Sequence, residues 1–340
     1  MATATTERRD AYFDNAKYLV IVLVACGHAW EPLTHTGRAV HAAYLTVYAF
    51  HMPAFALISG YLSRSYDAGP RRTRRLVAGV LIPYLVFETA YSLFARYTME
   101  PGNPISLMDP WYVMWFLVAL FIWRLTAPVW QQLRYPVPIA LAIATLAAAS
   151  PGLGGELALQ RVLGFLPYFV LGLRLRPEHF AVVRNWPARL VALSVVAVTA
   201  VGCYAVAPWF NTEWLYHRDS VDGFGAARWT AVVAVPALFC LALLLTGCLL
   251  AWVPGRRLWF TRLGTGTLYG YLLHGFLVKA IRWWGWYDHP WLHTPLGELA
   301  VTGCAAVVIT LLCTPPVRRA FRGVVEPPLS WAFRDRTAPA

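Results

Sequence analysis

The sequence predicts an all-α integral membrane protein, a bundle of about ten transmembrane helices with both termini in the cytoplasm. Of its 340 residues, 58% are hydrophobic and 14% are charged, and the mean hydropathy is +0.50, which does not fit a soluble surface. The charged residues fall in short clusters between apolar stretches of about 20 residues, the length that crosses a hydrocarbon core. Stretches such as LVALSVVAVTAVGCYAVAP are apolar all round, which excludes the alternating strands of a membrane barrel.

Ten apolar stretches are expected to be spans. In order, they cover residues 18–36, 39–62, 76–98, 111–130, 136–150, 159–175, 188–208, 228–252, 264–284 and 296–314. The polar N-terminus runs into the first stretch without a small-residue cleavage pattern, so this span is expected to be retained rather than removed as a signal peptide. We therefore divide the chain into a cytoplasmic segment 1–17, a membrane domain 18–314 and a cytoplasmic basic tail 315–340.

The positive charge follows the membrane topology. The net charge is +12 and the isoelectric point is about 9.7, values that would also suit a nucleic-acid-binding protein. Placing the N-terminus inside puts most of the 29 Lys and Arg residues on the cytoplasmic side, as the positive-inside rule requires. We therefore expect no nucleic-acid partner, although arginines beside the membrane can bind anionic lipids.

The basic residues are 27 Arg against only 2 Lys, and Ala is abundant. This usage indicates a GC-rich bacterial genome. The cytoplasmic membrane of a bacterium is therefore the expected location.

Four ionisable residues inside expected spans stand out, since each is costly in lipid and usually faces a partner or a water-filled cavity. They are His28, His51, Glu88 and His274. Counted from the cytoplasmic span ends at about 1.5 Å per residue, all four come out roughly 15 to 20 Å deep. A single buried histidine is more often a structural side chain. Four titratable groups at one depth on four spans instead predict a shared polar cavity.

The first span places a cationic group and an imidazole on one face. Lys17 and His28 are eleven residues apart, which brings them to within roughly 20° of one face and about 16 Å apart along the helix. Asp14 lies on nearly the same face. This spacing suits a substrate with an anionic part at the cytosolic surface and a reactive end in the bundle, where a histidine can transfer protons. The alternative is a basic flank and a packed histidine.

Four arginines precede the third span, at positions 71, 72, 74 and 75. Topology alone explains basic residues here. However, Arg71 with Arg74, and Arg72 with Arg75, are each one helical turn apart, so two guanidinium groups can converge on one phosphate. The six cysteines lie within expected spans without metal-ligand spacing, and no metal is expected.

Several fragments occur in a fixed order: DNAKYLVIVLVACGH, FHMPAFALISGYLSR, RRTRRLVAGVLIPY, WFLVAL, FLPYFVLGL and GTGTLYGYLLHGF. Over about residues 12–315, this ordered set resembles the membrane-bound acyltransferase-3 family, O-acyltransferases that modify surface glycans and some secreted small molecules. The resemblance implies transfer of an acyl group, usually acetyl, from cytoplasmic acyl-CoA to a hydroxyl of an acceptor.

The resemblance also implies roles for particular residues. Lys17 and His28 match the family's basic-x10-His motif, although many members carry Arg at the first position, so Lys17 keeps the charge but loses bidentate geometry. The Arg-x-x-Arg motif is met by Arg71 with Arg74 and by Arg72 with Arg75, and the second pair fits better by its distance from LIPY. Ser59, Gly60 and Tyr61 match the short motif that closes the second span, and Ser59 and Tyr61 are expected to bind the substrate.

Together these readings predict a mechanism. The arginines and Lys17 would hold the phosphates of acetyl-CoA or another acyl-CoA, and His28 would act as general base toward the acceptor hydroxyl. An acyl-histidine intermediate is the alternative. Glu88 or Asp14 would orient the imidazole. His51, His274 and Trp115 would line the acceptor side, where a glycan or glycosylated small molecule is expected.

Two other functions compete. The titratable residues inside the spans also suit a proton-coupled transporter or glycan exporter. No second copy of the Lys17-to-His28 pattern occurs in the later half of the chain, which weighs against a repeat-built transporter. A non-catalytic scaffold would leave these residues unexplained.

Overall fold

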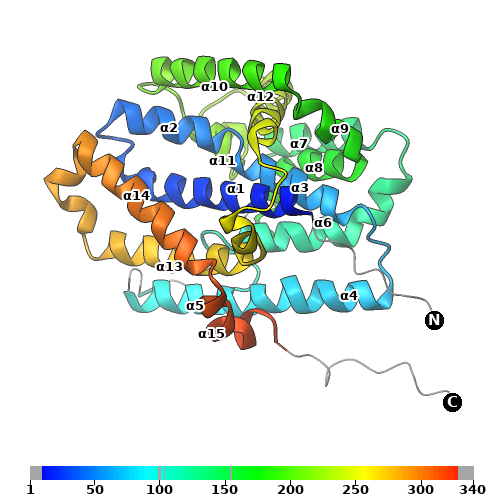
Figure 1. Cartoon of the computed structure of the whole chain (residues 1–340), viewed down its shortest axis with the longest axis horizontal. Helices are drawn as coiled ribbons and strands as arrows, with labels where there is room; N and C mark the ends of the chain where they lie inside the picture. The colour runs from blue at the N-terminus through cyan, green and yellow to red at the C-terminus, as the bar shows by residue number, and fades with distance from the viewer. Residues whose placement is uncertain (1–9, 99–100, 103, 154, 328–340) are drawn as a thin grey trace.

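The computed structural model describes residues 10–98, 101–102, 104–153 and 155–327, and within these ranges the regular structure is all helical. Helix α1 (Ala11–Trp30) runs through the middle of the bundle (Figure 1). It packs against four other helices, α2 (Arg38–Tyr48), α3 (His51–Ser63), α13 (Thr267–Trp283) and α14 (Pro295–Leu312). Residues of α1 therefore meet side chains from both halves of the sequence.

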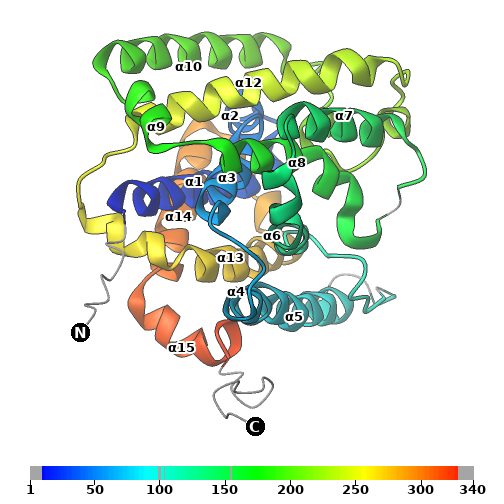
Figure 2. The ribbon, with the colours of Figure 1, turned by 90° about the vertical axis from the view of Figure 1, so that its right-hand side faces the viewer.

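The remaining helices surround this centre. On one side lies a long helical segment formed by α4 (Pro70–Leu76), a π-helical turn (Val77–Leu81) and α5 (Ile82–Thr98) (Figures 1 and 2). The opposite side carries α10 (Trp186–Val206) and α12 (Thr230–Trp252), as Figure 2 shows. The others are α6 (Trp115–Gln132), α7 (Pro136–Ala149), α8 (Leu159–Arg174), α9 (Pro177–Val183) and α11 (Glu213–Tyr216).

The helices have the length and surface of membrane spans. Seven helical segments are long and apolar enough to cross a membrane: Ala11–Leu33, Arg38–Ser63, Pro70–Thr98, Glu156–Arg174, Trp186–Val206, Thr230–Trp252 and Pro295–Leu312. The apolar helix α10 buries only Ala192, so nearly all of its surface suits lipid rather than water. The chain is a multi-pass membrane protein. The other three expected spans coincide with α6, α7 and α13, and the count of ten crossings stays a prediction.

The first expected span is shifted along the chain. It was expected at 18–36, but α1 begins at Ala11, where Asp10 caps the helix by accepting a hydrogen bond from the Tyr12 amide at 2.9 Å. The helix ends at Trp30 because Pro32, in the following 3-10 turn Glu31–Leu33, has no amide proton for a helical hydrogen bond. His28 therefore lies in the last turn of α1, not near the middle of the helix.

The second expected span, 39–62, is two helices. The chain breaks between α2 and α3, where Phe50 has φ −139° and ψ −14°. Tyr48 therefore ends one helix and His51 begins the next. This break, which the continuous apolar pattern conceals, brings both side chains to one place.

Two glycines bring α3 and α8 into close contact. A Cβ atom at Gly60 would overlap the carbonyl oxygen of Phe169, and one at Gly172 would overlap that of Leu57. Small residues of this kind let helix backbones approach in membrane proteins. Gly60 thus has a packing role within the segment that resembles a family motif.

Part of the expected cytoplasmic tail belongs to the bundle. Residues Pro315–Val325 form α15, which packs against α5, α13 and α14. Arg318 donates a hydrogen bond to the Thr265 hydroxyl at 2.6 Å, and Val325 is fully buried. The remainder of the tail, 328–340, and the N-terminal residues 1–9 lie outside the described residues.

Candidate active site

A cavity of about 410 Å³ opens where α1 ends and the α2–α3 break lies. Its walls come from α1, α2, α3, α6, α8, α11 and α13, and from the loop at residues 109–113. The lining residues are Val24, His28, Glu31, Tyr44, Tyr48, His51, Met52, Asp109, Pro110, Trp111, Tyr112, Val113, Trp115, Arg161, Phe165, Leu215, Tyr216, Arg218, Tyr271 and Lys279. Three of the predicted site residues, His28, His51 and Trp115, are among them.

His28 lies at the wall of this cavity. Its Nδ1 is 3.3 Å from the hydroxyl of Tyr48, and its ring centroid is 5.1 Å from that of Tyr112 and 5.5 Å from that of His274. Within the described part of the chain, Tyr48 is its hydrogen-bond partner, which leaves Nε2 for a substrate. An imidazole with one nitrogen held and the other free has the arrangement that a general base requires.

The other two histidines are fixed in one tautomer by helix carbonyls. His51 Nδ1 is 2.9 Å from the Val47 carbonyl oxygen, and His274 Nδ1 is 2.7 Å from that of Tyr271. A carbonyl only accepts, so Nδ1 carries the proton in both rings. The opposite nitrogen of His274, Nε2, is buried without a hydrogen-bond partner in the described structure. Both rings therefore offer an acceptor nitrogen on the side away from their carbonyl.

Tyrosine side chains hold the imidazole of His28 in place. The Tyr48 ring stacks on Tyr44 at 3.9 Å and meets the edge of His51 at 4.6 Å. The Tyr44 hydroxyl is hydrogen-bonded to that of Tyr216. The partner of His28 is thus itself fixed by packing. No spacing signal in the sequence identifies these tyrosines.

Glu88 supports the cavity wall from behind. Its side chain is fully buried and accepts hydrogen bonds from the Trp111 amide at 2.9 Å and from the Ser92 hydroxyl at 3.1 Å. The residue after Trp111, Tyr112, has a positive φ of 52°. This strained conformation must be stabilised by the surrounding structure. The expectation that Glu88 orients His28 directly differs from this geometry, in which the carboxylate holds the loop that carries Tyr112.

Trp115 and Arg161 form a neighbouring part of the wall. The Trp115 ring stacks on Phe165 at 5.2 Å, and the Arg161 guanidinium lies 5.2 Å from the Trp115 ring centre. The sequence reasoning did not include Arg161 or Lys279 in the site. Both lie inside expected spans but toward a span end, so the criterion of an ionisable residue at mid-membrane depth, which selected His28, did not select them.

Ser59 and Tyr61 lie away from the cavity. Tyr61 is ten residues along α3 from His51, which is about 15 Å of rise. Its ring stacks on Phe13 at 4.6 Å and meets Phe180 at 4.7 Å. Tyr61 therefore packs near the start of α1. The structure does not bring it or Ser59 to the substrate side where they were expected.

Asp14 and Lys17 lie near the start of α1, far from His28. The Asp14 carboxylate is 2.8 Å from the Lys17 ammonium. Asp14 precedes His28 by fourteen residues, about 21 Å along the helix, so it cannot orient that imidazole directly. The expected Asp14–His28 contact is therefore wrong.

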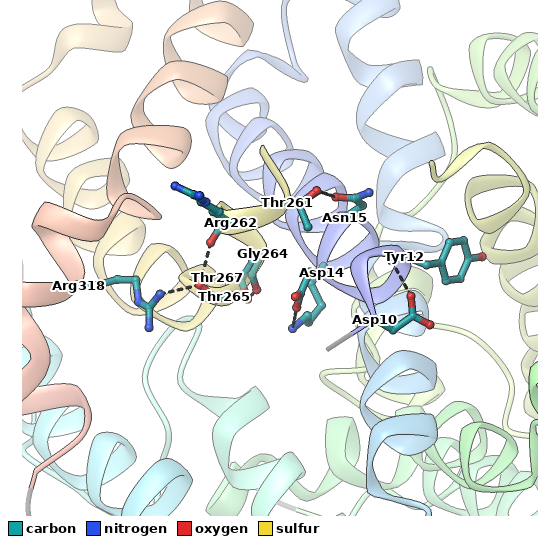
Figure 3. Close-up of polar contacts among 11 residues, drawn as sticks. Asp10, Tyr12, Asp14, Asn15, Thr261, Arg262, Gly264, Thr265, Thr267 and Arg318 are labelled. Atoms are coloured by element: carbon teal, nitrogen blue, oxygen red, sulfur yellow. Dashed lines mark hydrogen bonds and ion pairs between the residues drawn. The ribbon is translucent and has the colours of Figure 1, made fainter. Parts of the chain in front are cut away.

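The start of α1 is held by the 3-10 segment Trp259–Thr265. Figure 3 shows Asp14 beside this segment, Thr261 bonded to Asn15, and Arg318 bonded to Thr265. The Thr261 hydroxyl donates to Asn15 Oδ1 at 2.7 Å. A second pocket, of about 500 Å³, lies here and is lined by Asp14, Arg257 and Arg262 among others. This end of α1 is polar and partly open.

The four arginines lie on α4. Arg71 and Arg75 are exposed, whereas Arg72 and Arg74 are half-buried. Arg72 forms an ion pair with Asp67 at 3.5 Å. The helical conformation places the two members of each expected pair one turn apart.

In the described ranges, no three His, Cys, Asp or Glu side chains converge to hold a metal ion.

Comparison with known proteins identifies relatives over most of the chain. Residues 10–315 match the acyltransferase-3 family, described as an acyltransferase domain. A nodulation protein NolL of Sinorhizobium fredii is 26% identical over 305 residues, 82% of this chain and 80% of the relative. A NolL protein of Mesorhizobium japonicum is 43% identical over 63 residues, covering 18% of this chain and 17% of the relative. No solved structure matches. The family match spans the helices and loops that build the cavity around His28, and this chain therefore belongs to the acyltransferase-3 family of membrane acyltransferases.

Proposed function

We propose that the protein is an O-acyltransferase that moves an acyl group, preferentially acetyl, from cytoplasmic acyl-CoA to a hydroxyl of an acceptor. The observation that carries this proposal is the arrangement around His28. Its Nδ1 is held by Tyr48 at 3.3 Å while the ring lines a cavity. A positioned imidazole with a free nitrogen is what hydroxyl activation requires.

The proposed reaction begins with the acceptor hydroxyl at His28 Nε2. Nδ1 carries the proton and donates a hydrogen bond to the Tyr48 oxygen. This bond fixes the tautomer in which Nε2 can accept a proton. As Nε2 takes the hydroxyl proton, the acceptor oxygen attacks the thioester carbonyl. The new C–O bond forms, the C–S bond breaks, and the leaving thiolate of CoA takes the proton from the imidazolium.

The donor phosphates are proposed to bind at the opposite end of α1. Arg72 and Arg75, one turn apart on α4, supply guanidinium groups for them, with Arg71 and Arg74 beside them and Lys17 as a point charge. Lys17 and His28 are about 16 Å apart along α1. The pantetheine arm would extend over this distance to place the thioester at His28.

The acceptor side is proposed to lie at the cavity. His51 and Trp115 line it, and His274 contacts His28. An aromatic wall with several hydrogen-bonding groups suits a glycan or a glycosylated small molecule. We place the enzyme in the bacterial cytoplasmic membrane with both termini inside, where the family's donor is available.

Donor binding tests this function without knowledge of the acceptor. Binding of acetyl-CoA to the purified, detergent-solubilised protein would be measured for wild type, Arg72→Ala and Arg75→Ala. Loss of a charge-assisted hydrogen bond should weaken binding about tenfold or more. Arg134→Ala is the matched control, because Arg134 is an exposed arginine beyond α6 whose contact is with the Tyr135 ring at 5.2 Å.

Saturable binding that is weakened in both α4 variants and kept in the control supports the proposed donor site. Equal loss in the control would place the site elsewhere. If folded wild-type protein binds neither acetyl-CoA nor longer acyl-CoAs, the proposed function is wrong.

A further inference from the structure

Arg161 is a cation in the cavity wall without a matching anion. It is half-buried near the start of α8, and its guanidinium lies 5.2 Å from the Trp115 ring centre. Within the described residues, no hydrogen bond or ion pair to its side chain is found. A guanidinium withdrawn from water is costly unless an anion or acceptors compensate it. The missing compensation indicates that a ligand supplies it.

Nearby arginines are different because they already have carboxylate partners. Arg218, which lines the same cavity, is 2.9 Å from Glu213 and 3.2 Å from Asp219. Arg282 pairs with Glu31 at 3.2 Å. Arg161 therefore differs from Arg218 and Arg282 because it has no carboxylate partner among the described residues.

Arg161 also lies at a junction between two chambers. A further pocket of about 490 Å³ lies next to the His28 cavity, and Asp109, Pro110, Arg161 and Arg218 line both. The outer chamber has a polar wall that includes Gln160, Ser220 and three aspartates, Asp109, Asp219 and Asp222. Two of these aspartates are already paired, Asp219 with Arg218 at 3.2 Å and Asp222 with Arg228 at 3.1 Å. A molecule that extends from the outer chamber to His28 therefore passes Arg161.

We propose that Arg161 binds an anionic group, a carboxylate or phosphate, of the acceptor, which makes the enzyme selective for acidic or phosphorylated sugars. This inference rests on the proposed function. The acceptor hydroxyl would reach His28 while its acidic group pairs with Arg161 and the rest occupies the outer chamber. The CoA phosphates do not supply this anion, since their proposed site lies near Lys17, about 16 Å along α1 from His28.

Matched sugar pairs test this selectivity. Full-length protein in lipid nanodiscs would be titrated with glucuronic acid against glucose, galacturonic acid against galactose, and glucose 6-phosphate against glucose, with binding followed by ligand-observed NMR. Wild type should bind the acidic member of at least one pair about tenfold more tightly. R161Q should abolish that preference, and Arg161→Lys should retain part of it.

Arg218→Gln is the matched control, because it removes the same charge from the same cavity but from an arginine that is already paired. It should reduce the preference by twofold or less. Acetyl-CoA affinity should be unchanged in both Gln variants, which also shows that they fold. The proposal is overturned if wild type shows no preference in any pair, or if R161Q keeps it.

Binding measurements with two acyl-CoA donors distinguish whether the anion belongs to the acceptor or to the acyl group. If R161Q weakens succinyl-CoA binding relative to acetyl-CoA while acidic-sugar preference is unchanged, the anion belongs to the acyl group and the acceptor assignment is wrong. If acetyl-CoA fails to bind wild type but an Arg161-dependent acid preference is present, the proposed function falls and the anion site stands.

Discussion

The two ends of α1 hold their polar groups in opposite ways. At the start, Asp14 pairs with Lys17 at 2.8 Å, and Asn15 is hydrogen-bonded to Thr261 and to the carbonyl oxygen of Pro254. At the other end, His28 has one hydrogen bond of 3.3 Å, to Tyr48. The polar side chains of α1 itself are bonded within the protein at the first end, whereas His28 at the second end keeps unused hydrogen-bonding capacity.

The incomplete end extends beyond His28. The Tyr112 hydroxyl and His274 Nε2 are buried without hydrogen-bond partners among the described residues, and Arg161 has no carboxylate partner there. Buried polar groups are usually bonded, so groups left unbonded around one cavity indicate that a substrate completes the network. The comparison supports our proposal that the chemistry takes place at the end with His28 and that the donor is anchored at the end with Lys17.

The strongest test of this division is His28→Ala. Removing a general base should lower the turnover rate by about 10² to 10⁴, while acyl-CoA affinity stays within about twofold, because the proposed site of the donor phosphates is at the other end. Turnover would be followed as release of free CoA thiol, with binding measured separately.

The pH profile of wild type is the control for this assignment. Activity should rise with pH as the base loses its proton, since only a neutral imidazole accepts the acceptor's hydrogen. A rate that falls as the pH rises from about 5 to 7 would contradict the role of His28 as base. Equal loss of acyl-CoA binding in His28→Ala would contradict the division between the two ends.

Glu88 offers a second test at the cavity end, where it acts as a positioning residue for the loop that carries Trp111 and Tyr112. Glu88→Ala leaves the buried Trp111 amide without its acceptor, which costs about 1–3 kcal/mol, and frees the strained backbone of Tyr112. We expect the turnover rate to fall about tenfold. Glu88→Gln keeps an acceptor oxygen and should retain most activity.

Ser92→Ala is the control for Glu88, since it removes only the weaker donor to the same carboxylate and should have little effect. If Glu88→Gln were as damaging as Glu88→Ala and altered the pH profile, Glu88 would take part in proton transfer rather than position the loop.

The sequence predicted the helical membrane class well because apolar length is a local property. All ten expected spans coincide with helices, although seven helical segments meet the length and hydropathy of a span. The break before His51 has a local signal, Pro53, which has no amide proton for a helical hydrogen bond and therefore fits only in the first turn of α3. The prediction used apolar length alone and did not use this signal.

The sequence identified residues of the candidate site only where a titratable side chain lies inside an expected span, because burying such a group in lipid is costly. That criterion identified His28, His51 and His274, which the structure brings to one place. The start of α1 was not predicted, because Asp10 caps the helix eight residues before the expected start of the first span. Tyr48 and Tyr112 carry no such cost, and their placement depends on helix ends and loop conformation that a single sequence does not reveal.

The smallest expected effect concerns His217, in the loop at the cavity end. Its ring packs 4.8 Å from that of Phe165, and burial, together with the nearby Arg161 charge, lowers its pKa to about 4. Unfolding therefore promotes protonation, so stability is lost as pH falls from about 6.5 to about 4. His217→Asn tolerates the same positive φ of 48° but does not titrate. The melting temperature of this variant should therefore fall less between those pH values than that of wild type. Equal falls would mean that protonating His217 does not weaken the cavity-end loop, and the contrast between the two ends would then concern ligand binding alone.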